Sequence, residues 1–163
     1  MSIKAIETEY KGCRFRSRLE ARWAVFFNAL ALRWHYEPEG YQIEHEGEII
    51  RYLPDFKVES IGVVEVKGPP LKDMDKFKIE AFVGQSKESI TVLSNIPSQD
   101  NPDKHKHLNC TYDENLKTVR WGTIDLREMT QQTPYALTAA ISLAVDSALN
   151  TARSARFEHG EKG

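Results

Sequence analysis

The sequence predicts one α/β domain whose core elements run helix, strand, strand, strand, helix, strand, followed by a C-terminal helical extension. Apolar residues recur at helical spacing in residues 17–33 and 72–85, which indicates two amphipathic helices. Short β-forming segments bounded by turn residues lie between and just after them. A chain of 163 residues is long enough to bury one hydrophobic core. We therefore treat residues 1–163 as a single domain, with a core at about residues 10–95 and an extension at about residues 96–163.

The first helix is expected over residues 17–33, after a short lead-in at residues 10–14. Ser17 is a suitable N-cap, and Glu20 follows three residues later, as in a capping box. Large apolar side chains then fall on one face of the helix: Leu19, Trp23, Phe26, Phe27 and Leu30. We interpret this stripe as core rather than as a surface that stacks on bases.

Three strands are expected after this helix. Residues 41–45 alternate between apolar and polar side chains and form the first strand. Residues 49–58 form the second strand, in which Pro54 implies a bulge or a local irregularity. Residues 62–67 form the third strand, which is short and apolar enough to be central. Turn residues at positions 59–62 make the second and third strands a hairpin.

This hairpin is expected to gather charged side chains on one patch. Asp55 on the second strand can lie close to Glu65 on the third. Glu65 and Lys67 are two residues apart and share a face, while the valines between and before them point to the other face. Two carboxylates and an ammonium suit a Mg²⁺ ion that activates water against a phosphodiester.

The alternative for this patch is a set of cross-strand ion pairs on a solvated face. Carboxylates placed close together cost free energy unless a cation or a proton lies between them. The expected proximity of Asp55 and Glu65 therefore hints at a metal site, although without further motif context the structural patch is the better interpretation.

The rest of the chain completes the core and adds the extension. We expect a second helix at residues 72–85 and a fourth strand at residues 89–94. A polar loop at residues 95–107, a further strand at 118–126 and an alanine-rich helix at 134–156 follow. Pro134 suits the first turn of the last helix. The alanines of that helix allow close packing, either within the domain or across a homodimer.

The composition is that of a soluble globular protein, with 40% hydrophobic and 28% charged residues. No apolar run approaches the roughly 18 residues that span a bilayer, and residues 1–5 lack the apolar segment of a signal peptide. The two cysteines make no disulfide framework, and with His105 and His107 they match no zinc-ligand spacing. We therefore expect a cytoplasmic protein without a membrane partner.

Charge is unevenly distributed along the chain. The net charge of −2 argues against a simple nucleic-acid coat. Residues 1–35 nevertheless carry seven basic and three acidic side chains, whereas residues 36–66 carry two basic and eight acidic ones. In a metal-dependent nuclease, arginines hold phosphates and carboxylates hold the cation. The alternative is a mixed, solvated surface.

Together, Glu20, Pro54-Asp55 and Glu65-Val66-Lys67 resemble the motif of the PD-(D/E)XK nuclease superfamily. Three runs look like those of the TnsA-type transposase endonucleases and of small phage or mobile-element nucleases: residues 15–20 (FRSRLE), 52–56 (YLPDF) and 64–68 (VEVKG). The resemblance implies a restriction-endonuclease-like αβββαβ core, with a mixed sheet flanked by helices.

The resemblance also implies roles for single residues. Asp55 and Glu65 correspond to the carboxylates that ligate Mg²⁺, for which Mn²⁺ substitutes, and Val66 offers its backbone carbonyl as a further ligand. Lys67 corresponds to the lysine that orients or helps to deprotonate the attacking water. Glu20 corresponds to an additional acid that binds a second metal or a metal-bound water. The alternative for Glu20 is a capping-box glutamate, and the two roles are compatible.

Basic residues near these positions are candidates for DNA contacts. Arg16 precedes Glu20 by four residues, so it either touches a phosphate near the metal or forms a helix-face ion pair. Arg18, Lys76 and Lys78 are further candidates to line a DNA groove. Basic residues at the end of the last helix, Arg153 and Arg156, are interpreted as partners of the helix dipole, with backbone phosphates as the alternative.

These observations predict a Mg²⁺-dependent deoxyribonuclease. One alternative is a structure-selective nuclease such as a junction resolvase, or the DNA-cutting subunit of a transposase or defence complex, because the modest net charge favours a partner protein. Another is a non-catalytic nucleic-acid-binding protein with the same fold. The presence of Asp55, Glu65 and Lys67 together argues against this last alternative.

Overall fold

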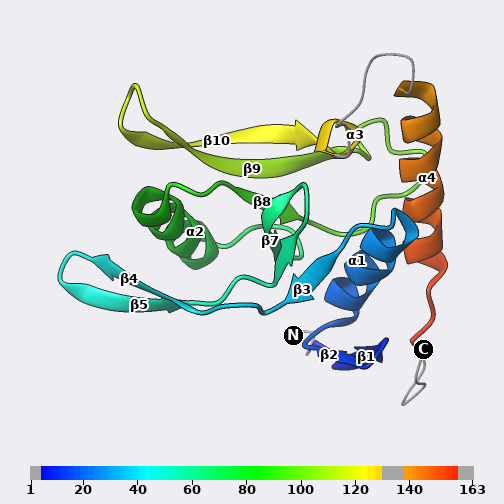
Figure 1. Cartoon of the computed structure of the whole chain (residues 1–163), viewed down its shortest axis with the longest axis horizontal. Helices are drawn as coiled ribbons and strands as arrows, with labels where there is room; N and C mark the ends of the chain where they lie inside the picture. The colour runs from blue at the N-terminus through cyan, green and yellow to red at the C-terminus, as the bar shows by residue number, and fades with distance from the viewer. Residues whose placement is uncertain (1–4, 130–137, 158–163) are drawn as a thin grey trace.

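The computed structural model describes residues 5–129 and 138–157. This part of the chain is a mixed α/β fold with one six-stranded sheet, two two-stranded sheets and four helices (Figure 1). The helices are α1 (Arg18–Ala29), α2 (Asp73–Ser86), α3 (Leu126–Met129) and α4 (Thr138–Ser154). None of the helices within these described ranges is long and apolar enough to cross a membrane.

The six-stranded sheet has the order β10-β9-β8-β7-β6-β3. Its strands are β3 (Trp34–Tyr36), β6 (Phe56–Val58), β7 (Gly62–Val66), β8 (Ile90–Leu93), β9 (Lys106–Asp113) and β10 (Thr118–Asp125). Neighbouring strands are antiparallel except β7 and β8, which run parallel. A parallel pair needs a long crossover, and α2 supplies it.

Two hairpins lie outside this sheet. They are β1 (Thr8–Tyr10) with β2 (Cys13–Phe15), and β4 (Tyr41–His45) with β5 (Glu48–Tyr52). The first occupies the expected lead-in, where Gly12 takes a φ of +74° in the connecting turn. The second hairpin packs against α2, since Gln85 accepts the Glu44 N–H at 3.0 Å and donates to the Gln42 carbonyl at 3.1 Å.

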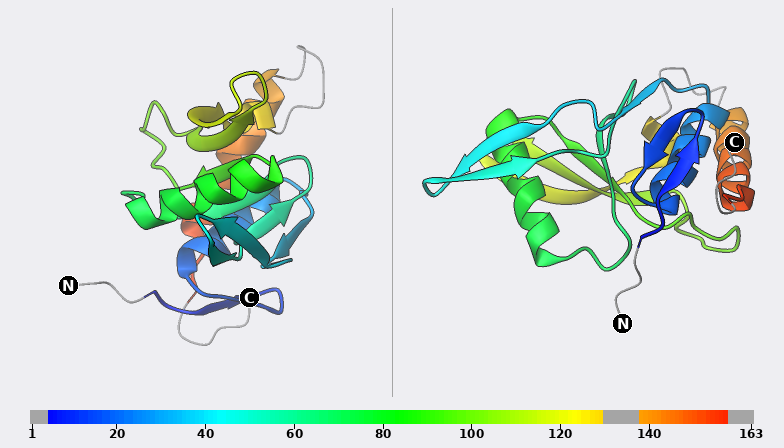
Figure 2. Two further views of the ribbon diagram at one scale, coloured as in Figure 1. Left: turned by 90° about the vertical axis from the view of Figure 1, so that its left-hand side faces the viewer. Right: turned by 90° about the horizontal axis from the view of Figure 1, so that it is seen from below.

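The central sheet carries a separate hydrophobic cluster on each face. One cluster joins α1 and α4 to the sheet and includes Trp23, Phe26, Phe27, Phe56, Val64, Val66, Val145 and Leu149. The other joins α2 to the sheet and includes Val63, Ile79, Phe82, Val83, Ile90 and Val92. Figure 2 shows α2 at one end, α1 and α4 at the other, and the central strands between them. The apolar stripe of the first helix is core, as expected.

The first helix is shorter than expected, and an additional strand follows it. It ends at Ala29 rather than near residue 33, because the chain reverses at Ala31, which has a φ of 55°. Residues Trp34–Tyr36 then form the edge strand β3, which pairs with β6. The rings of Trp34 and Tyr36 pack against Phe15 and Phe56. They cover the sheet edge.

The prediction of one strand over residues 49–58 was wrong. β5 ends at Tyr52 and pairs only with β4, whereas β6 begins at Phe56 and pairs with β3 and β7. Pro54 lies between the two strands, where its missing N–H interrupts no ladder. The elements of the central sheet therefore run α1-β3-β6-β7-α2-β8, with the β4–β5 hairpin inserted before β6. This break places Asp55 at the start of β6.

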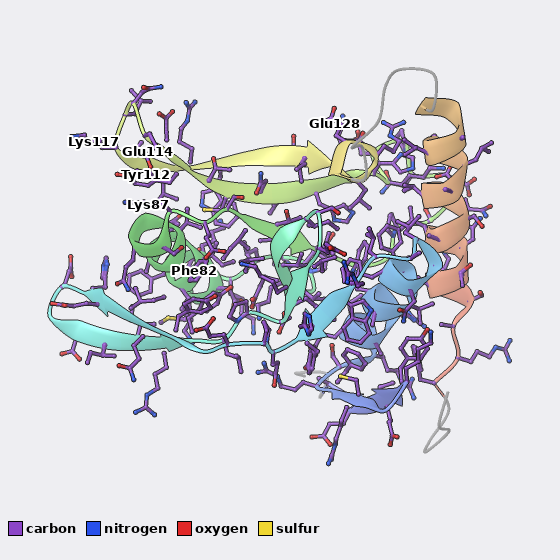
Figure 3. All side chains as sticks on the ribbon, viewed as in Figure 1. Phe82, Lys87, Tyr112, Glu114, Lys117 and Glu128 are labelled. Carbon is purple, nitrogen blue, oxygen red and sulfur yellow. The ribbon has the colours of Figure 1, made fainter. Side chains whose placement is uncertain are left out.

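The chain beyond residue 95 is more than a helical extension. β9 was not predicted, and with the expected β10 it extends the central sheet beyond β8. Lys87, at the end of α2, places its Nζ 3.4 Å from the Tyr112 ring centroid and so ties α2 to β9 (Figure 3).

The last helix packs within the domain. α4 buries Ala148 and Ala152 in the cluster shared with α1. Its expected start at residue 134 lies outside the described residues, and its described part ends at Ser154.

Candidate active site

Asp55 and Glu65 face each other across the β6–β7 hairpin. Phe56 pairs with Val64, and continuing this register by one residue places Asp55 opposite Glu65. Both residues are buried, with 4% and 3% of their surface exposed. The hairpin expected from the sequence is confirmed, and it brings two carboxylates into the interior.

The Asp55 carboxylate is held by the backbone of β7. Its Oδ2 accepts the Val66 N–H at 2.7 Å, and its Oδ1 lies 3.8 Å from the Arg16 guanidinium. Burial, followed by the negative charge of Glu65, raises the pKa of Asp55 to about 7. Ionised Asp55 is therefore under-stabilised by the protein alone, so the site favours an added cation or proton.

The Glu65 carboxylate is held between two side chains. Its Oε1 lies 2.6 Å from Lys67 Nζ, and its Oε2 accepts the Tyr52 hydroxyl at 2.7 Å. The contact confirms that Glu65 and Lys67, which directly follows β7, lie on the same side of the chain. Tyr52 was not predicted as a partner. The usable signal was a tyrosine three residues before Asp55, because a tyrosine that becomes buried normally finds a hydrogen-bond partner for its hydroxyl.

Lys67 is a cation at neutral pH. Burial would lower the pKa of its ammonium, but the charges of Glu65 and Asp55 outweigh burial and leave the pKa raised. A protonated lysine donates hydrogen bonds and cannot remove a proton from water. The arrangement therefore favours an orienting, charge-stabilising role for Lys67 over a role as general base.

Ser17 caps α1 as expected, and Glu20 folds back onto the Ser17 hydroxyl and the Arg16 N–H rather than onto the Ser17 N–H of a full capping box. Ser17 Oγ accepts the Glu20 N–H at 3.2 Å and donates to Glu20 Oε1 at 2.7 Å. Glu20 Oε2 accepts the Tyr36 hydroxyl at 2.5 Å and the Arg16 N–H at 3.1 Å. Both carboxylate oxygens are thus engaged within the protein, and the side chain contributes to the negative potential at Asp55.

The expected helix-face pair between Arg16 and Glu20 does not form. Ser17 is the N-cap, so Arg16 precedes the helix. Its guanidinium forms an ion pair with Glu37 and points toward Asp55 instead. With 58% of its side chain exposed, Arg16 is the arginine best placed to meet a phosphate that approaches the carboxylates.

The other candidate DNA contacts lie on two helices. Lys76 is exposed and Lys78 half-buried on α2, and neither forms an ion pair with a described residue. Arg18 is half-buried on α1 and lines a pocket with other arginines. At the expected backbone ligand, Val66, the N–H is bound to Asp55.

The donor atoms present fit a hydrated Mg²⁺ ion. No group of three or more His, Cys, Asp and Glu side chains within residues 5–129 and 138–157 is arranged to hold a metal. Mg²⁺, however, is usually bound through one or two carboxylates, several waters and substrate phosphates. Asp55 Oδ1 lies 3.8 Å from the Arg16 guanidinium, and Glu65 is opposite Asp55 in the hairpin register. Two hard carboxylates of this kind match that mode of binding.

No family model, no curated protein and no solved structure matches the chain. The chemistry of the site is therefore inferred from its own groups. These are two buried carboxylates, a protonated lysine and an exposed arginine beside Asp55.

The Tyr52→Phe substitution tests how Glu65 is oriented. Removing the hydroxyl leaves Glu65 Oε2 without its donor, so the carboxylate loses one of its two fixed contacts. Loss of a group that orients a metal ligand typically weakens metal binding by about 10–100-fold, and we expect a loss at the lower end of that range. Titration calorimetry with Mn²⁺ measures it. Unchanged affinity would show that Tyr52 only fills space.

The Glu20→Gln substitution separates a capping role from a metal role. Glutamine also suits a capping box, but it weakens the charged bonds to Ser17 and Tyr36. We expect a loss of about 1 kcal/mol in the free energy of unfolding and a change of less than about 10-fold in the DNA cleavage that the sequence predicts. A loss of cleavage as large as that of an Asp55 variant would contradict this assignment.

Proposed function

We propose that this protein is a Mg²⁺-dependent deoxyribonuclease of the PD-(D/E)XK type, which hydrolyses DNA phosphodiester bonds. The observation that carries the proposal is the cluster of buried Asp55 and Glu65 with half-buried Lys67, at the adjoining ends of β6 and β7. The element order α1-β3-β6-β7-α2-β8 agrees with the αβββαβ core of that superfamily.

Electrostatics support the proposal. Two buried carboxylates share one ammonium, and the raised pKa of Asp55 reflects burial and the repulsion between the carboxylates. A structural ion pair needs only one carboxylate for Lys67, and the other cation beside the pair, the exposed Arg16 guanidinium, lies 3.8 Å from Asp55 Oδ1. The second carboxylate is explained if Asp55 and Glu65 together hold a divalent cation. Bound there, Mg²⁺ would lower the pKa of a water molecule and offset charge on the scissile phosphate.

The residues of the chain then have distinct tasks. Asp55 is fixed by the Val66 N–H, and Glu65 is oriented by Tyr52. Lys67 donates hydrogen bonds to the attacking water or to a phosphate oxygen, which stabilises the charge that develops in the transition state. Arg16, exposed beside Asp55, binds a phosphate oxygen and positions the strand.

The test is cleavage of supercoiled plasmid and of single-stranded DNA with Mg²⁺, Mn²⁺ or EDTA. We expect cleavage with either metal and none with EDTA, leaving 5′-phosphate and 3′-hydroxyl ends. A four-way junction serves as an additional substrate for the structure-selective alternative. Absence of metal-dependent cleavage on all three substrates would contradict the proposal.

A further inference from the structure

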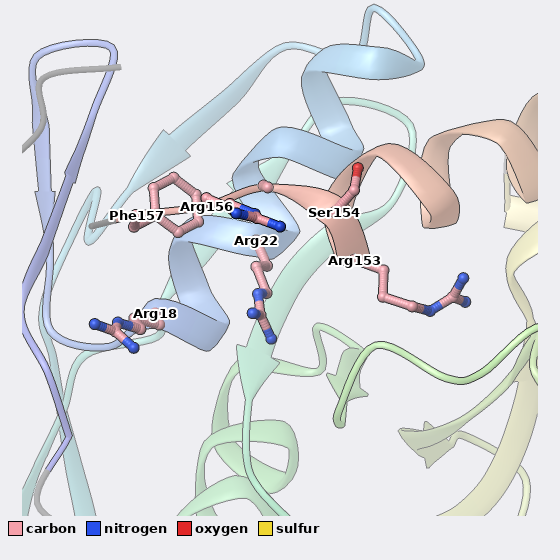
Figure 4. Close-up of a pocket in the computed structure, with 7 residues that line it drawn as sticks. Arg18, Arg22, Arg153, Ser154, Arg156 and Phe157 are labelled. Carbon is pink, nitrogen blue, oxygen red and sulfur yellow. The ribbon is translucent and has the colours of Figure 1, made fainter.

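A strongly basic pocket lies between the first turns of α1 and the end of α4. It has a volume of about 470 Å³ and is lined by Arg18 and Arg22 from α1 and by Arg153 and Arg156 from the end of α4 (Figure 4). No acidic side chain among the described residues lines it. Four guanidinium groups around one hollow repel each other unless negative charge joins them.

The arginines of this pocket carry unsatisfied donors. The Nε atoms of Arg18, Arg22 and Arg153 are buried and have no hydrogen-bond partner among the described residues. Arg153 is otherwise anchored, because its Nη1 donates to Asn150 at 2.7 Å and its Nη2 to the Pro97 carbonyl. A buried donor without a partner is unfavourable and rare in folded proteins. These covered Nε atoms add to the cost of the uncompensated positive charge, and the four arginines that line the pocket favour a negatively charged ligand from outside the chain.

The arrangement of the arginines indicates the shape of that acceptor. Figure 4 shows the guanidinium groups of Arg18, Arg22 and Arg153 spread along the pocket rather than converging on one point. A single compact anion would satisfy only part of such a row. A chain of regularly spaced phosphates would satisfy it along its length, and the guanidinium fork binds phosphate oxygens well.

We propose that this pocket binds successive backbone phosphates of a nucleic-acid strand. This binding is inferred from the pocket itself. That the bound strand is also the substrate rests on the proposed function. Arg18 and Arg22 are each two residues from Glu20, so they project from the opposite side of α1. The N-terminus of α1 borders the carboxylate site, and the opposite side of the same helix carries Arg18 and Arg22. We call the row of pocket arginines that would contact the phosphates the phosphate track. Arg153 and Arg156 then contact phosphates instead of only complementing the dipole of α4.

The test measures binding of a short fluorescent DNA strand in EDTA, by anisotropy, at several salt concentrations. For the Arg18→Gln/Arg22→Gln protein we expect about 10-fold weaker binding. The slope of log affinity against log salt concentration should also be smaller, by the amount that about one to two phosphate contacts contribute. The matched control is Arg33→Gln/Arg120→Gln, which removes two positive charges from exposed ion pairs outside the pocket. The control should bind within about twofold of wild type.

A second variant distinguishes the loss of positive charge from a failure to fold. Arg18→Lys/Arg22→Lys keeps both charges and should recover most of the affinity and the salt dependence. An equal loss of binding in the Arg33/Arg120 control would overturn the proposal, because the effect would then come from net charge. Unchanged strand binding, with inorganic phosphate bound by wild type and not by the glutamine variant, would overturn the assignment to a strand.

The outcome is separable from that of the nuclease proposal, because binding in EDTA needs no metal. If the glutamine variant binds the strand normally while wild type cleaves with Mg²⁺, the phosphate track is wrong and the nuclease proposal stands. If wild type binds the strand through the pocket but never cleaves, the track stands and the nuclease proposal is wrong.

Discussion

In EDTA near pH 8, the Asp55→Asn protein should melt about 3–6 °C above wild type, although it loses a proposed metal ligand. Burial and the nearby Glu65 carboxylate raise the pKa of Asp55 from 3.8 to about 7, so ionised Asp55 destabilises the folded state. Asparagine carries no charge and still accepts the Val66 N–H through its side-chain oxygen. Differential scanning calorimetry of both proteins measures the difference.

The stabilisation by Asp55→Asn, measured as the rise in melting temperature, should increase with pH. Because the pKa of Asp55 is higher in the folded protein than in the unfolded chain, the folded state binds more protons between pH 3.8 and about 7. Wild-type stability should therefore fall as pH rises through that range and level off above it. The variant lacks this titrating carboxyl. Its extra stability over wild type should therefore be small near pH 3.8 and reach its full value near pH 8.

Asp113→Asn is the matched control. Bonds from the Leu116 N–H, the Arg120 guanidinium and the Asn115 N–H lower the pKa of Asp113. Removing that charge should therefore lower the melting temperature near pH 8, opposite in sign to Asp55→Asn. Equal or lower melting of Asp55→Asn than of wild type near pH 8 would contradict the account of a strained carboxylate pair.

Lys67→Met should abolish metal-dependent cleavage, with a rate at least about 100-fold below wild type. The ammonium lies 2.6 Å from Glu65 Oε1 and is protonated at neutral pH, so its removal takes away the donor proposed to stabilise transition-state charge. Methionine keeps an apolar stem of similar length. Mn²⁺ affinity should not fall, because the substitution also removes a positive charge that repels the cation.

Lys57→Met serves as the comparison for Lys67→Met. Lys57 is on the neighbouring strand β6 and forms an exposed ion pair with Glu88 at 2.7 Å. Its loss should leave cleavage within about twofold of wild type. If both lysine variants cleave equally well, Lys67 has no role in the chemistry. If Lys67→Met loses Mn²⁺ binding as well as cleavage, its role is to hold the site together.

Local patterns in the sequence predicted the features that local geometry controls. The Ser17 cap of α1 and its contact with Glu20 formed because their hydrogen bonds span only three residues. The β6–β7 hairpin formed because valine-rich segments flank a short turn. Its register then places Asp55 opposite Glu65, and the two-residue period of a strand brings Lys67 to Glu65.

Features that depend on distant partners were missed. Whether one strand continues through Pro54 depends on which strands pair with the residues before and after it. Here the residues before Pro54 pair with β4, and those after it pair with β3. β9 is rich in polar residues, and its pairing with β8 and β10 defines it as a strand. The arginine pocket joins residues 18 and 153, which only tertiary packing of α1 on α4 brings together.

The most direct test of the central claim, that Asp55 and Glu65 form a divalent-cation site, is calorimetric titration of Mn²⁺ into wild type and Asp55→Asn near pH 8. We expect saturable binding by wild type and a loss of affinity of about 100-fold or more in the variant, which removes a ligand charge. Absence of Mn²⁺ binding by wild type, or equal affinity of the two proteins, would contradict the claim.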